Sequence, residues 1–441
     1  MQVTVIMPTY NHERYVREAI ESVFSQQVEL ELLIMDDGST DGTRHAVWSA
    51  LSAHPGRARF FAQEHHRGAC AVINDLLSRA RGEYVALLNS DDRFCPHKLA
   101  RQLAWMKAHP KVAACFTGVR LIGENGGPYT GARPPFCGFT TRNRSRTQWL
   151  KTFFYEGNCL CHPSILARRE RYTERFDERL CKLPDYDRWV RLCKREEIFV
   201  LPDQLLEFRV REGEKNASAK TPQTVSLIAQ ELPVVLDRFL DLTEEDALAV
   251  FGETGSEVER KFIAYREGLK LSPAGQQWGI RGLYGLLGDP AAAACLARRG
   301  FDGCALAALA AQCDPFGLLN VTARLYYADD RDRRRHALPF AEARSVPVGA
   351  LEGGFCCVFP LLRKVAALRF DPAERPCRVR LTAARLRFPS GRTADILPLL
   401  RHNGRAEGEW VSFPHDDPSF TAVLPAQCRP ESAEFEGELE F

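Results

Sequence analysis

Three short polar segments of this 441-residue chain combine residue types that could bind a phosphorylated ligand. Each follows a run of apolar residues, and they are Pro8-Thr9-Tyr10-Asn11, Asp36 to Gly42 (DDGSTDG) and Asn89-Ser90-Asp91-Asp92. In parallel α/β sheets, ligands bind outside the carboxyl ends of the strands. Acidic side chains there suit a divalent cation with a phosphate ligand, because hard cations take carboxylate oxygens. We therefore expect the three segments to meet at one edge of a sheet.

Other phosphate-binding sites and simpler structures compete with this interpretation. No G-x-G-x-x-G follows a predicted strand and no G-x-x-x-x-G-K-[ST] is present, which disfavours dinucleotide-binding and P-loop sites. The Asp36–Gly42 segment could be only a turn that caps a helix, and Asn89–Asp92 could be a second capped turn. Their order and spacing together are more specific than either segment alone.

The elements that must position these segments alternate between strand and helix. Strands are predicted at 2–7, 30–35, 59–62 and 84–88, and the runs LELLIM and YVALL read as strands buried on both faces. Helices are predicted at 12–26, 41–54, 69–81 and 96–106, the last with Pro96 in its first turn. This alternation predicts an α/β domain with a mostly parallel sheet.

The rest of the chain changes character twice. Residues 221–315 are rich in Ala and Leu at helical spacing, and Thr243 could cap a helix whose first turn is acidic. From about residue 318 the pattern is that of short strands, clearest in Arg378–Phe388 (RVRLTAARLRF). The predicted parts are therefore an α/β domain at 1–220, a helical region at 221–317 and an all-β domain at 318–441.

The ordered set of motifs in the first half resembles the family 2 glycosyltransferases, which have the GT-A fold, a Rossmann-like sheet. The resemblance covers about residues 1–218. It rests on Pro8 to Asn11, Ser22-Val23, Gln26, Asp36 to Gly42, Arg81 to Tyr84, Asn89 to Asp92, His162-Pro163-Ser164, Leu183 to Trp189 (LPDYDRW) and Phe208 to Arg211. The set is specific for the family and says little about which sugar is moved.

The resemblance implies a binding site for the base of a nucleotide sugar. Asp37 matches the carboxylate that accepts a hydrogen bond from the base, typically uracil, and Asp36 supports that turn. Pro8 and Tyr10 match the segment that lines the base and the ribose. His66 stands where the family often has Asn, which is a departure.

It also implies a site for Mn²⁺ or Mg²⁺ against the donor diphosphate. Asp91 matches the last acid of the family's D-x-D motif, the metal ligand, and Ser90 matches its middle position. Asn89 stands where the first Asp often lies, so metal affinity would rest mostly on Asp91 and the donor phosphates. Arg209 and Arg211 either contact the diphosphate or lie on the surface.

Asp185 matches the family's catalytic base, although Pro184 replaces the Glu or Gln that usually precedes it. A single carboxylate that takes the acceptor hydroxyl's proton supports a direct, inverting displacement. Asp185 could instead cap the helix that follows, whose dipole would keep its pKa low. His162 could border the acceptor site, but a place in the core is favoured.

Composition limits the partners and the compartment. With 59 basic and 57 acidic residues the net charge is +2, which predicts no nucleic-acid partner. No apolar run is long enough to span a bilayer, and the N-terminus does not read as a signal peptide. Fifteen cysteines without such a signal favour a reducing compartment. We expect a cytoplasmic protein. For the basic run at 331–335 (RDRRR) a solvated face is favoured, and peripheral contact with the inner face of the membrane is the alternative.

The all-β part weakly resembles jelly-roll modules of bacterial polysaccharide enzymes. Phe388, Trp410, Phe413 and Phe420 could stack on sugars there, although core packing is favoured for each.

The predicted function is that of a metal-dependent inverting glycosyltransferase that uses a nucleotide sugar, typically a UDP-sugar. Its acceptor would be a hydroxyl group of a cell-surface glycan, free, lipid-linked or on a protein. Two alternatives stay open. One is a catalytically inactive carbohydrate-binding or scaffold protein, at which Asn89 and Pro184 hint. The other is a GT-A-like sugar nucleotidyltransferase, although Met7–Arg14 lacks the Gly-rich loop of such enzymes.

Overall fold

The structure is a computed structural model that describes most of the chain. The described residues are 1–130, 139, 142–211, 216, 221–315, 320–328, 341–349, 353–361, 365–373, 376–415, 417–424 and 428–440. The chain folds as two compact units, Met1–Ala310 and Ala311–Phe441. The basic run at 331–335 lies outside the described residues, as do the predicted boundary residues 220, 317 and 318.

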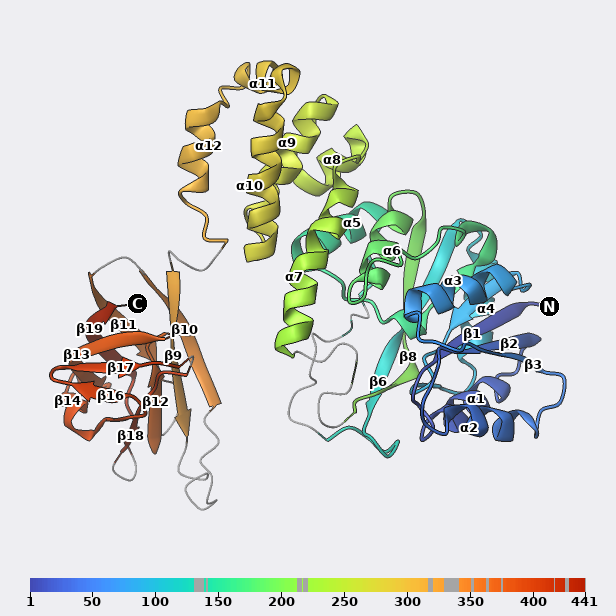
Figure 1. The fold of residues 1–441 in the computed structure, drawn as a ribbon, viewed down its shortest axis with the longest axis horizontal. Helices are drawn as coiled ribbons and strands as arrows, with labels where there is room; N and C mark the ends of the chain where they lie inside the picture. Colours follow the sequence, from blue (N-terminus) through green and yellow to red (C-terminus); the bar gives the residue numbers. More distant parts are fainter. Residues whose placement is uncertain are drawn as a thin grey trace. The chain divides into compact units, whose positions relative to one another are not determined.

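The first unit is built around one eight-stranded sheet, which confirms the predicted α/β class (Figure 1). Strands β1, β2, β3 and β4 run parallel to one another, and so do β6 and β8, whereas β5 and β7 are antiparallel to their neighbours. The order is β3-β2-β1-β4-β7-β6-β8-β5. The strands are β1 (Val3–Thr9), β2 (Leu30–Asp36), β3 (Ala58–Ala62), β4 (Tyr84–Leu87), β5 (Arg93–Phe94), β6 (Val112–Ile122), β7 (Leu166–Arg168) and β8 (Glu197–Arg209).

Helices cover both faces of this sheet. The apolar faces of α1 (Val16–Phe24), α2 (Thr43–Leu51) and α4 (Lys98–Ala108) pack in one hydrophobic cluster. Those of α3 (Ala69–Arg79), α5 (Arg146–Glu156) and α6 (Pro184–Cys193) pack in a second cluster on the opposite face. The strands between them alternate their side chains between the two clusters, as residues of a doubly covered sheet must. Short 3-10 turns precede and follow β7, η1 (His162–Ser164) and η2 (Arg169–Arg171).

The start of the helical region continues the second cluster, while its later helices also form a smaller cluster around Phe262, Leu283 and Leu296. Val235, Leu236 and Phe239 are at most 1% exposed and lie in the same cluster as the α5 and α6 residues. The helices are α7 (Pro222–Leu236), α8 (Glu244–Phe251), α9 (Glu257–Gly268), α10 (Pro273–Gly288), α11 (Pro290–Ala297) and α12 (Gly303–Ala310), with η3 (Asp237–Phe239) after α7. Thr243 caps α8 as predicted, because its hydroxyl accepts from the Asp246 N–H.

Three predicted helices begin later in the chain than expected. The helix at 12–26 begins at Val16 of α1, and that at 41–54 begins at Thr43 of α2. The helix at 96–106 begins two residues later, at Lys98 of α4, so Pro96 precedes the helix instead of lying in its first turn. His97 separates the two with a left-handed backbone (φ +62°). The spacing of apolar residues does not reveal this left-handed turn, at which the chain changes direction before α4.

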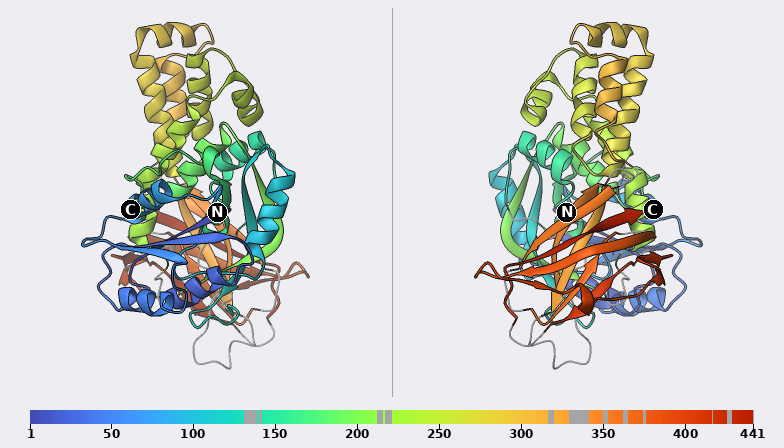
Figure 2. Two further views of the ribbon diagram at one scale, coloured as in Figure 1. Left: turned by 90° about the vertical axis from the view of Figure 1, so that its right-hand side faces the viewer. Right: turned by 90° about the vertical axis from the view of Figure 1, so that its left-hand side faces the viewer.

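The second unit consists of two antiparallel sheets, as predicted, and Figure 2 shows its strands as orange and red arrows. Phe413 and Phe420 are buried in its core, while Trp410 is half-buried, with the guanidinium groups of Arg378 and Arg380 over its ring. The strands are β9 (Asn320–Ala328), β10 (Ala341–Gly349), β11 (Gly353–Pro360), β12 (Ala367–Asp371), β13 (Cys377–Arg387), β14 (Thr393–Asp395), β15 (Arg401–His402), β16 (Arg405–Glu407), β17 (Trp410–Phe413), β18 (Phe420–Val423) and β19 (Ser432–Glu440), with the turn η5 (Leu397–Leu399).

Candidate active site

Four parallel strands end at one edge of the first sheet and place the predicted segments together. Thr9 at the end of β1 lies opposite Asp36 at the end of β2, which lies opposite Ala62 at the end of β3. On the other side, Ile6 of β1 lies opposite Leu87 of β4. The chain segments that follow these strands, 10–13, 37–42, 63–68 and 88–92, therefore start from the same edge, as the sequence predicts.

A buried carboxylate and two aromatic rings form one side of this edge. Asp37 is 3% exposed, and its oxygens accept hydrogen bonds from the backbone N–H groups of Arg67 (2.7 Å) and Gly68 (2.9 Å). The Nδ1 atom of His66 lies 2.9 Å from Asp37 Oδ2. The exposed ring of Tyr10 lies 4.3 Å from the His66 ring, centroid to centroid. A planar base that stacks on these rings would reach an acceptor already held in place by the protein.

The turn after β2 is fixed by Asp36 and Gly38. Asp36 is fully buried and accepts from the Ser39 N–H (3.1 Å) and from Arg44 Nε (2.7 Å), so it organises the turn instead of facing a ligand. Gly38 has φ +75°, and a Cβ there would lie 2.7 Å from the His65 carbonyl carbon, so only glycine fits. Pro8 pairs with Met35 inside the sheet, one residue before β1 ends.

Side chains of the first segment tie it to the second. The Asn11 backbone N–H donates to Ser39 Oγ (2.9 Å), and Asn11 Oδ1 accepts from the Thr40 N–H (2.9 Å). The His12 N–H donates to Thr43 Oγ1 (2.8 Å). Because Asn11 has a left-handed φ of +52°, the chain turns sharply after Tyr10 and brings His12 back over the edge.

The acidic turn after β4 leaves one carboxylate partly exposed and buries the other. Asp92 is 1% exposed and accepts from the Arg209 N–H (2.9 Å) and from Asn89 Nδ2 (3.1 Å). Burial and the adjacent Asp91 carboxylate raise the pKa of Asp92. Asp92 is therefore a structural group, and Asp91 is the acid of this turn that a ligand could reach.

Two basic side chains, His12 and Arg211, flank Asp91. The sequence did not predict that they would lie together. His12 Nε2 and Arg211 Nη1 each lie 3.8 Å from Asp91 Oδ2, and they lie 2.9 Å from each other. His12 Nδ1 lies 2.8 Å from Ser90 Oγ. Burial lowers the pKa of His12, which favours its neutral form beside the Arg211 cation. Among the described residues, Arg211 Nε has no hydrogen-bond partner.

Arg209 and Arg211 have different roles in the structure. Arg209 is 1% exposed, and its guanidinium binds the Asp91 carbonyl (2.8 Å), the Glu124 carbonyl (2.8 Å) and the Glu18 carboxylate (2.8 Å). It therefore locks the acidic turn to the end of β8. Of the two arginines, Arg211 is the one positioned to meet a diphosphate.

The oxygen ligands at this edge suit a cation that the donor helps to bind. Among the residues that the structure describes, no group of three or more His, Cys, Asp and Glu side chains could hold a metal ion. Asp91 offers one accessible carboxylate and Asn89 an amide oxygen. Mg²⁺ is commonly held by one or two carboxylates together with substrate phosphates. The residues present fit Mg²⁺ or Mn²⁺ under that condition, with Asp91 as the anchor.

Asp185 lies in the first turn of α6, one residue after Pro184, and is half-buried. The helix cap is Leu183, so Asp185 does not cap α6. Its Oδ1 accepts from the Tyr186 N–H (2.8 Å) and its Oδ2 from Asn158 Nδ2 (2.8 Å). Burial nevertheless raises its pKa to about 6. The expectation of a low pKa from the helix dipole is therefore wrong, because desolvation outweighs the dipole and both hydrogen bonds.

The short loop at 158–161 lies close to both Asp185 and the acidic turn. The buried Cys161 thiol lies close enough to Asp92 and to Asp185 that both carboxylates raise its pKa, after burial itself. Asn158, three residues earlier, holds Asp185 directly. His162 belongs to the core, as favoured: it packs edge-on against Trp189 at 5.3 Å, and burial lowers its pKa to about 3.

Sequence comparison finds a known family in the part of the chain that carries these residues. Residues 4–170 match the sequence profile described as "Glycosyl transferase family 2". An uncharacterised glycosyltransferase of Methanocaldococcus jannaschii is 27% identical over 212 residues, which are 47% of this chain and 70% of that protein. A Bacillus subtilis protein named as a candidate teichuronic acid biosynthesis glycosyltransferase, TuaG, is 38% identical over 127 residues. The match covers 29% of this chain and 50% of TuaG.

Structural comparison finds a looser likeness. S. aureus TarS in complex with UDP-GlcNAc aligns with 64% of this chain and 80% of that one, at 21% identity and a TM-score of 0.46. In the described residues, no helix is both long and apolar enough to cross a membrane.

Proposed function

Since the N-terminal domain of this chain belongs to glycosyl transferase family 2 and the chain is a glycosyltransferase, we propose that the protein transfers a sugar from a UDP-sugar to a hydroxyl group. The transfer would invert the configuration at the anomeric carbon. One observation carries the proposal. The buried Asp37 carboxylate beside the Tyr10 and His66 rings shares a sheet edge with Asp91, Arg211 and His12. An acceptor for a base and a charged surface for a diphosphate thus lie on one edge of the sheet.

At the base end, Asp37 distinguishes nucleotides by their hydrogen-bonding pattern. A carboxylate accepts a hydrogen bond but cannot donate one when ionised. Uracil presents an imide N–H at N3, whereas cytosine presents an acceptor there. Asp37 therefore favours UDP over CDP, and the Tyr10 ring supplies a stacking surface for either base.

At the diphosphate end, charge must be neutralised as the bond to the sugar breaks. Arg211 contributes a guanidinium cation, and neutral His12 contributes a ring nitrogen. A Mg²⁺ or Mn²⁺ ion held by Asp91, with Asn89 and Ser90 nearby, would supply further positive charge to the leaving group.

Asp185 is the proposed general base. It would accept the proton of the acceptor hydroxyl while that oxygen attacks the anomeric carbon and the diphosphate leaves. A pKa of about 6 leaves the carboxylate ionised at neutral pH and makes it a stronger base than an ordinary aspartate. One carboxylate without a second carboxylate nucleophile supports inversion.

The acceptor is proposed as a hydroxyl of a cell-surface glycan, free, lipid-linked or on a protein. The similarity to TuaG, whose name places it in teichuronic acid biosynthesis, supports an acceptor of this class. We place the enzyme in the cytoplasm, where it could work at the inner face of the membrane. Family membership favours this function over an inactive scaffold or a nucleotidyltransferase.

Calorimetric titration with UDP and CDP, with and without Mn²⁺, tests the donor site. Asp37→Asn should weaken UDP binding by about 1.5–3 kcal/mol, the value of a hydrogen bond to a charged group, and should remove the preference for UDP over CDP. Asp91→Asn should remove the gain from Mn²⁺ and keep the base preference. Asp203→Asn, a half-buried surface partner of Arg101, is the control and should bind UDP as the wild type does. Equal affinity of wild type for UDP and CDP would contradict the proposal.

A further inference from the structure

Glu231 of α7 binds the backbone directly ahead of the proposed base. Its carboxylate accepts hydrogen bonds from three consecutive N–H groups, those of Cys181, Lys182 and Leu183, each at 2.8 Å. The side chain is 8% exposed. A buried carboxylate that receives three backbone donors holds those peptide groups in one arrangement, because charge-assisted hydrogen bonds are short and directional.

The segment held by Glu231 determines where α6 begins. Leu183 is the N-cap of α6 and makes no side-chain capping bond of its own. Asp185 follows two residues later, at a fixed helical geometry from Leu183. A shift of the 181–183 backbone therefore moves the Asp185 carboxylate with it. The negative charge of Glu231 also lies near the positive end of the α6 dipole, which favours this helix start.

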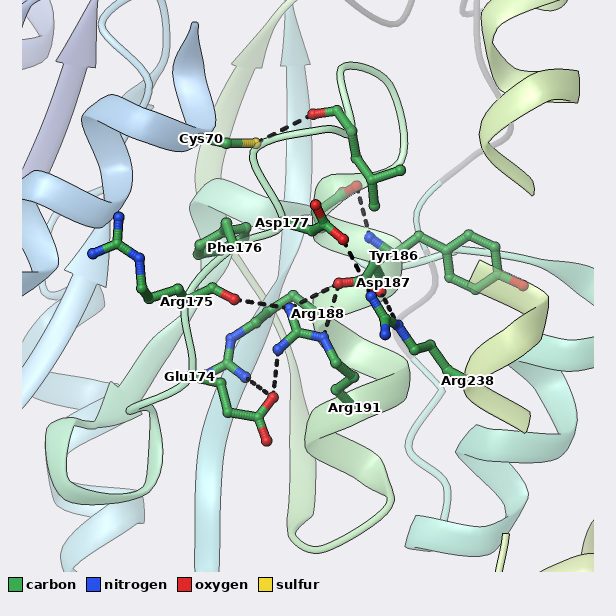
Figure 3. Close-up of polar contacts among 12 residues, drawn as sticks. Cys70, Glu174, Arg175, Phe176, Asp177, Tyr186, Asp187, Arg188, Arg191 and Arg238 are labelled. Carbon is green, nitrogen blue, oxygen red and sulfur yellow. Dashed lines mark hydrogen bonds and ion pairs between the residues drawn. The ribbon is translucent and has the colours of Figure 1, made fainter. Parts of the chain in front are cut away.

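A second link between the helical region and α6 lies one turn further along that helix. Asp187 is fully buried, and it accepts from Arg238 Nε of η3 (2.7 Å) and from Arg191 Nε (2.8 Å). Arg238 also reaches Asp177 (3.2 Å) in the loop before α6. Figure 3 shows the guanidinium groups of Arg191 and Arg238 converging on Asp187. The helical region thus fixes α6 at its start and along its first turns.

We propose that Glu231 is a positioning residue for glycosyl transfer, acting through the 181–183 backbone on the base Asp185. The inference rests on the proposed function of Asp185. Glu231 is separated from Asp185 by the loop it binds, and it takes part in no proton transfer. Its role is to keep the base at the distance and angle from the acceptor that the reaction needs.

Kinetics with a panel of UDP-glucose, UDP-galactose and UDP-GlcNAc, followed as UDP release, test the proposal on the full chain. Glu231→Ala should lower kcat on the order of 10²-fold, as a small misplacement of a catalytic group does, with KM for the donor unchanged. Added formate should restore part of kcat, because it can occupy the three vacated N–H groups. Glu231→Gln, which keeps one acceptor oxygen and nearly the same shape, should fall between wild type and Glu231→Ala.

Glu267→Ala is the matched control. Glu267 of α9 is also a carboxylate about 4% exposed that links the helical region to the sheet domain, through Tyr155 Oη of α5 (2.6 Å). Neither Glu267 nor Tyr155 belongs to the 181–183 segment or to α6. Glu267→Ala should lower the melting temperature without a selective loss of kcat and without rescue by formate. Equal kcat losses in both variants, or no loss in Glu231→Gln and Glu231→Ala, would overturn the positioning role.

Amide exchange separates this inference from the proposed function. In Glu231→Gln and Glu231→Ala, the amides of residues 181–183 and of Tyr186, which bonds Asp185 Oδ1, should exchange faster than in wild type. The Asp185→Asn background should show no additional kcat loss from Glu231→Ala, since the two act through one group. Unchanged exchange at Tyr186 would refute the inference. Absence of UDP release from wild type would refute the proposed function and leave the exchange result to decide the positioning of Asp185.

Discussion

At the scale of single residues, the proposed base Asp185 shows how burial decides between competing electrostatic effects. Its position in the first turn of α6 and its two hydrogen-bond donors, Tyr186 N–H and Asn158 Nδ2, favour the charged form. Burial disfavours that form and raises the pKa to about 6. The outcome is a carboxylate that loses its proton within the range where enzymes are commonly assayed.

The rate of transfer should therefore depend on pH with an ascending limb near pH 6. Below that pH the Asp185 carboxylate is protonated and cannot accept the hydroxyl proton, so kcat/KM should fall as pH decreases through about 6. Asp185→Asn should lower kcat by about 10²–10⁴-fold, the usual contribution of general base catalysis, and abolish the limb. A limb near pH 4 in wild type would show that Asp185 is not desolvated in solution.

Asn158→Ala provides the companion measurement. The Asn158 donor stabilises the charged form of Asp185, so its removal should move the limb to higher pH. UDP affinity should stay at the wild-type value, because Asn158 bonds Asp185 and the Leu160 N–H rather than the donor edge.

The sequence predicted the site residues that follow strands and missed those that approach from elsewhere. Asp37 and Asp91 were found because motifs that follow parallel strands must share an edge. Asn158 and Glu231 were not found, since their partners lie 27 and 48 to 50 residues away and no local pattern records that distance. His12 directly follows the first segment and was not predicted as a site residue; only the fold shows its ring 2.8 Å from Ser90 Oγ.

At the scale of elements, periodicity predicted β1 to β4 and α1 to α4 of the first unit, but it predicted neither β5 to β8 nor α5. LELLIM at 30–35 became β2 because a run of apolar residues buried on both faces has few other structures available. The start of α4 was missed because the left-handed turn at His97 is not an apolar pattern. The region at 222–310 was predicted to be helical. Its packing on α5 and α6 was not predicted, because the spacing of apolar residues within a helix does not identify the partner surface.

Helix α4 also contains a buried lysine that should make stability depend on pH. Lys98 is fully buried, donates to Gln102 Oε1 (2.8 Å), and burial lowers its pKa from 10.5 to about 7. Between those two values the unfolded chain binds more protons than the folded one, so the free energy of unfolding should rise with pH above about 7. Urea unfolding of wild type at several pH values from about 7 upward measures this slope.

Two variants of α4 isolate the Lys98 contribution. Lys98→Met removes the amine but fills similar space, so it should be more stable than wild type near neutral pH and should lose the Lys98 share of the slope. Lys107→Met changes an exposed lysine of the same helix and should keep the wild-type slope. Equal slopes in wild type and Lys98→Met would show that Lys98 is neutral throughout or is not buried.

At the scale of the whole molecule, the core of the first unit does not end where the sequence pattern changes near residue 220. Val235, Leu236, Phe239, Leu242 and Val250 are each at most 2% exposed and pack in the cluster that also contains α5 and α6. Glu231 and Arg238 add the polar links to the loop before α6 and to Asp187. The helical region therefore completes the sheet domain, while Ala311–Phe441 forms a unit of its own.

Two truncations should consequently behave in opposite ways. A chain that ends after Ala310 keeps the whole first unit and should unfold cooperatively and bind UDP with wild-type affinity. A chain that ends near residue 220 loses side chains whose burial stabilises by about 1.5–3 kcal/mol each. Losing several of them approaches the total stability of a typical domain, about 5–15 kcal/mol, so this chain should not fold cooperatively. Thermal unfolding and UDP titration of both chains measure the difference. Wild-type UDP affinity in the shorter chain would show that the segments at the strand ends alone build the donor site. It would also show that α7 to α10 position only the proposed general base, Asp185.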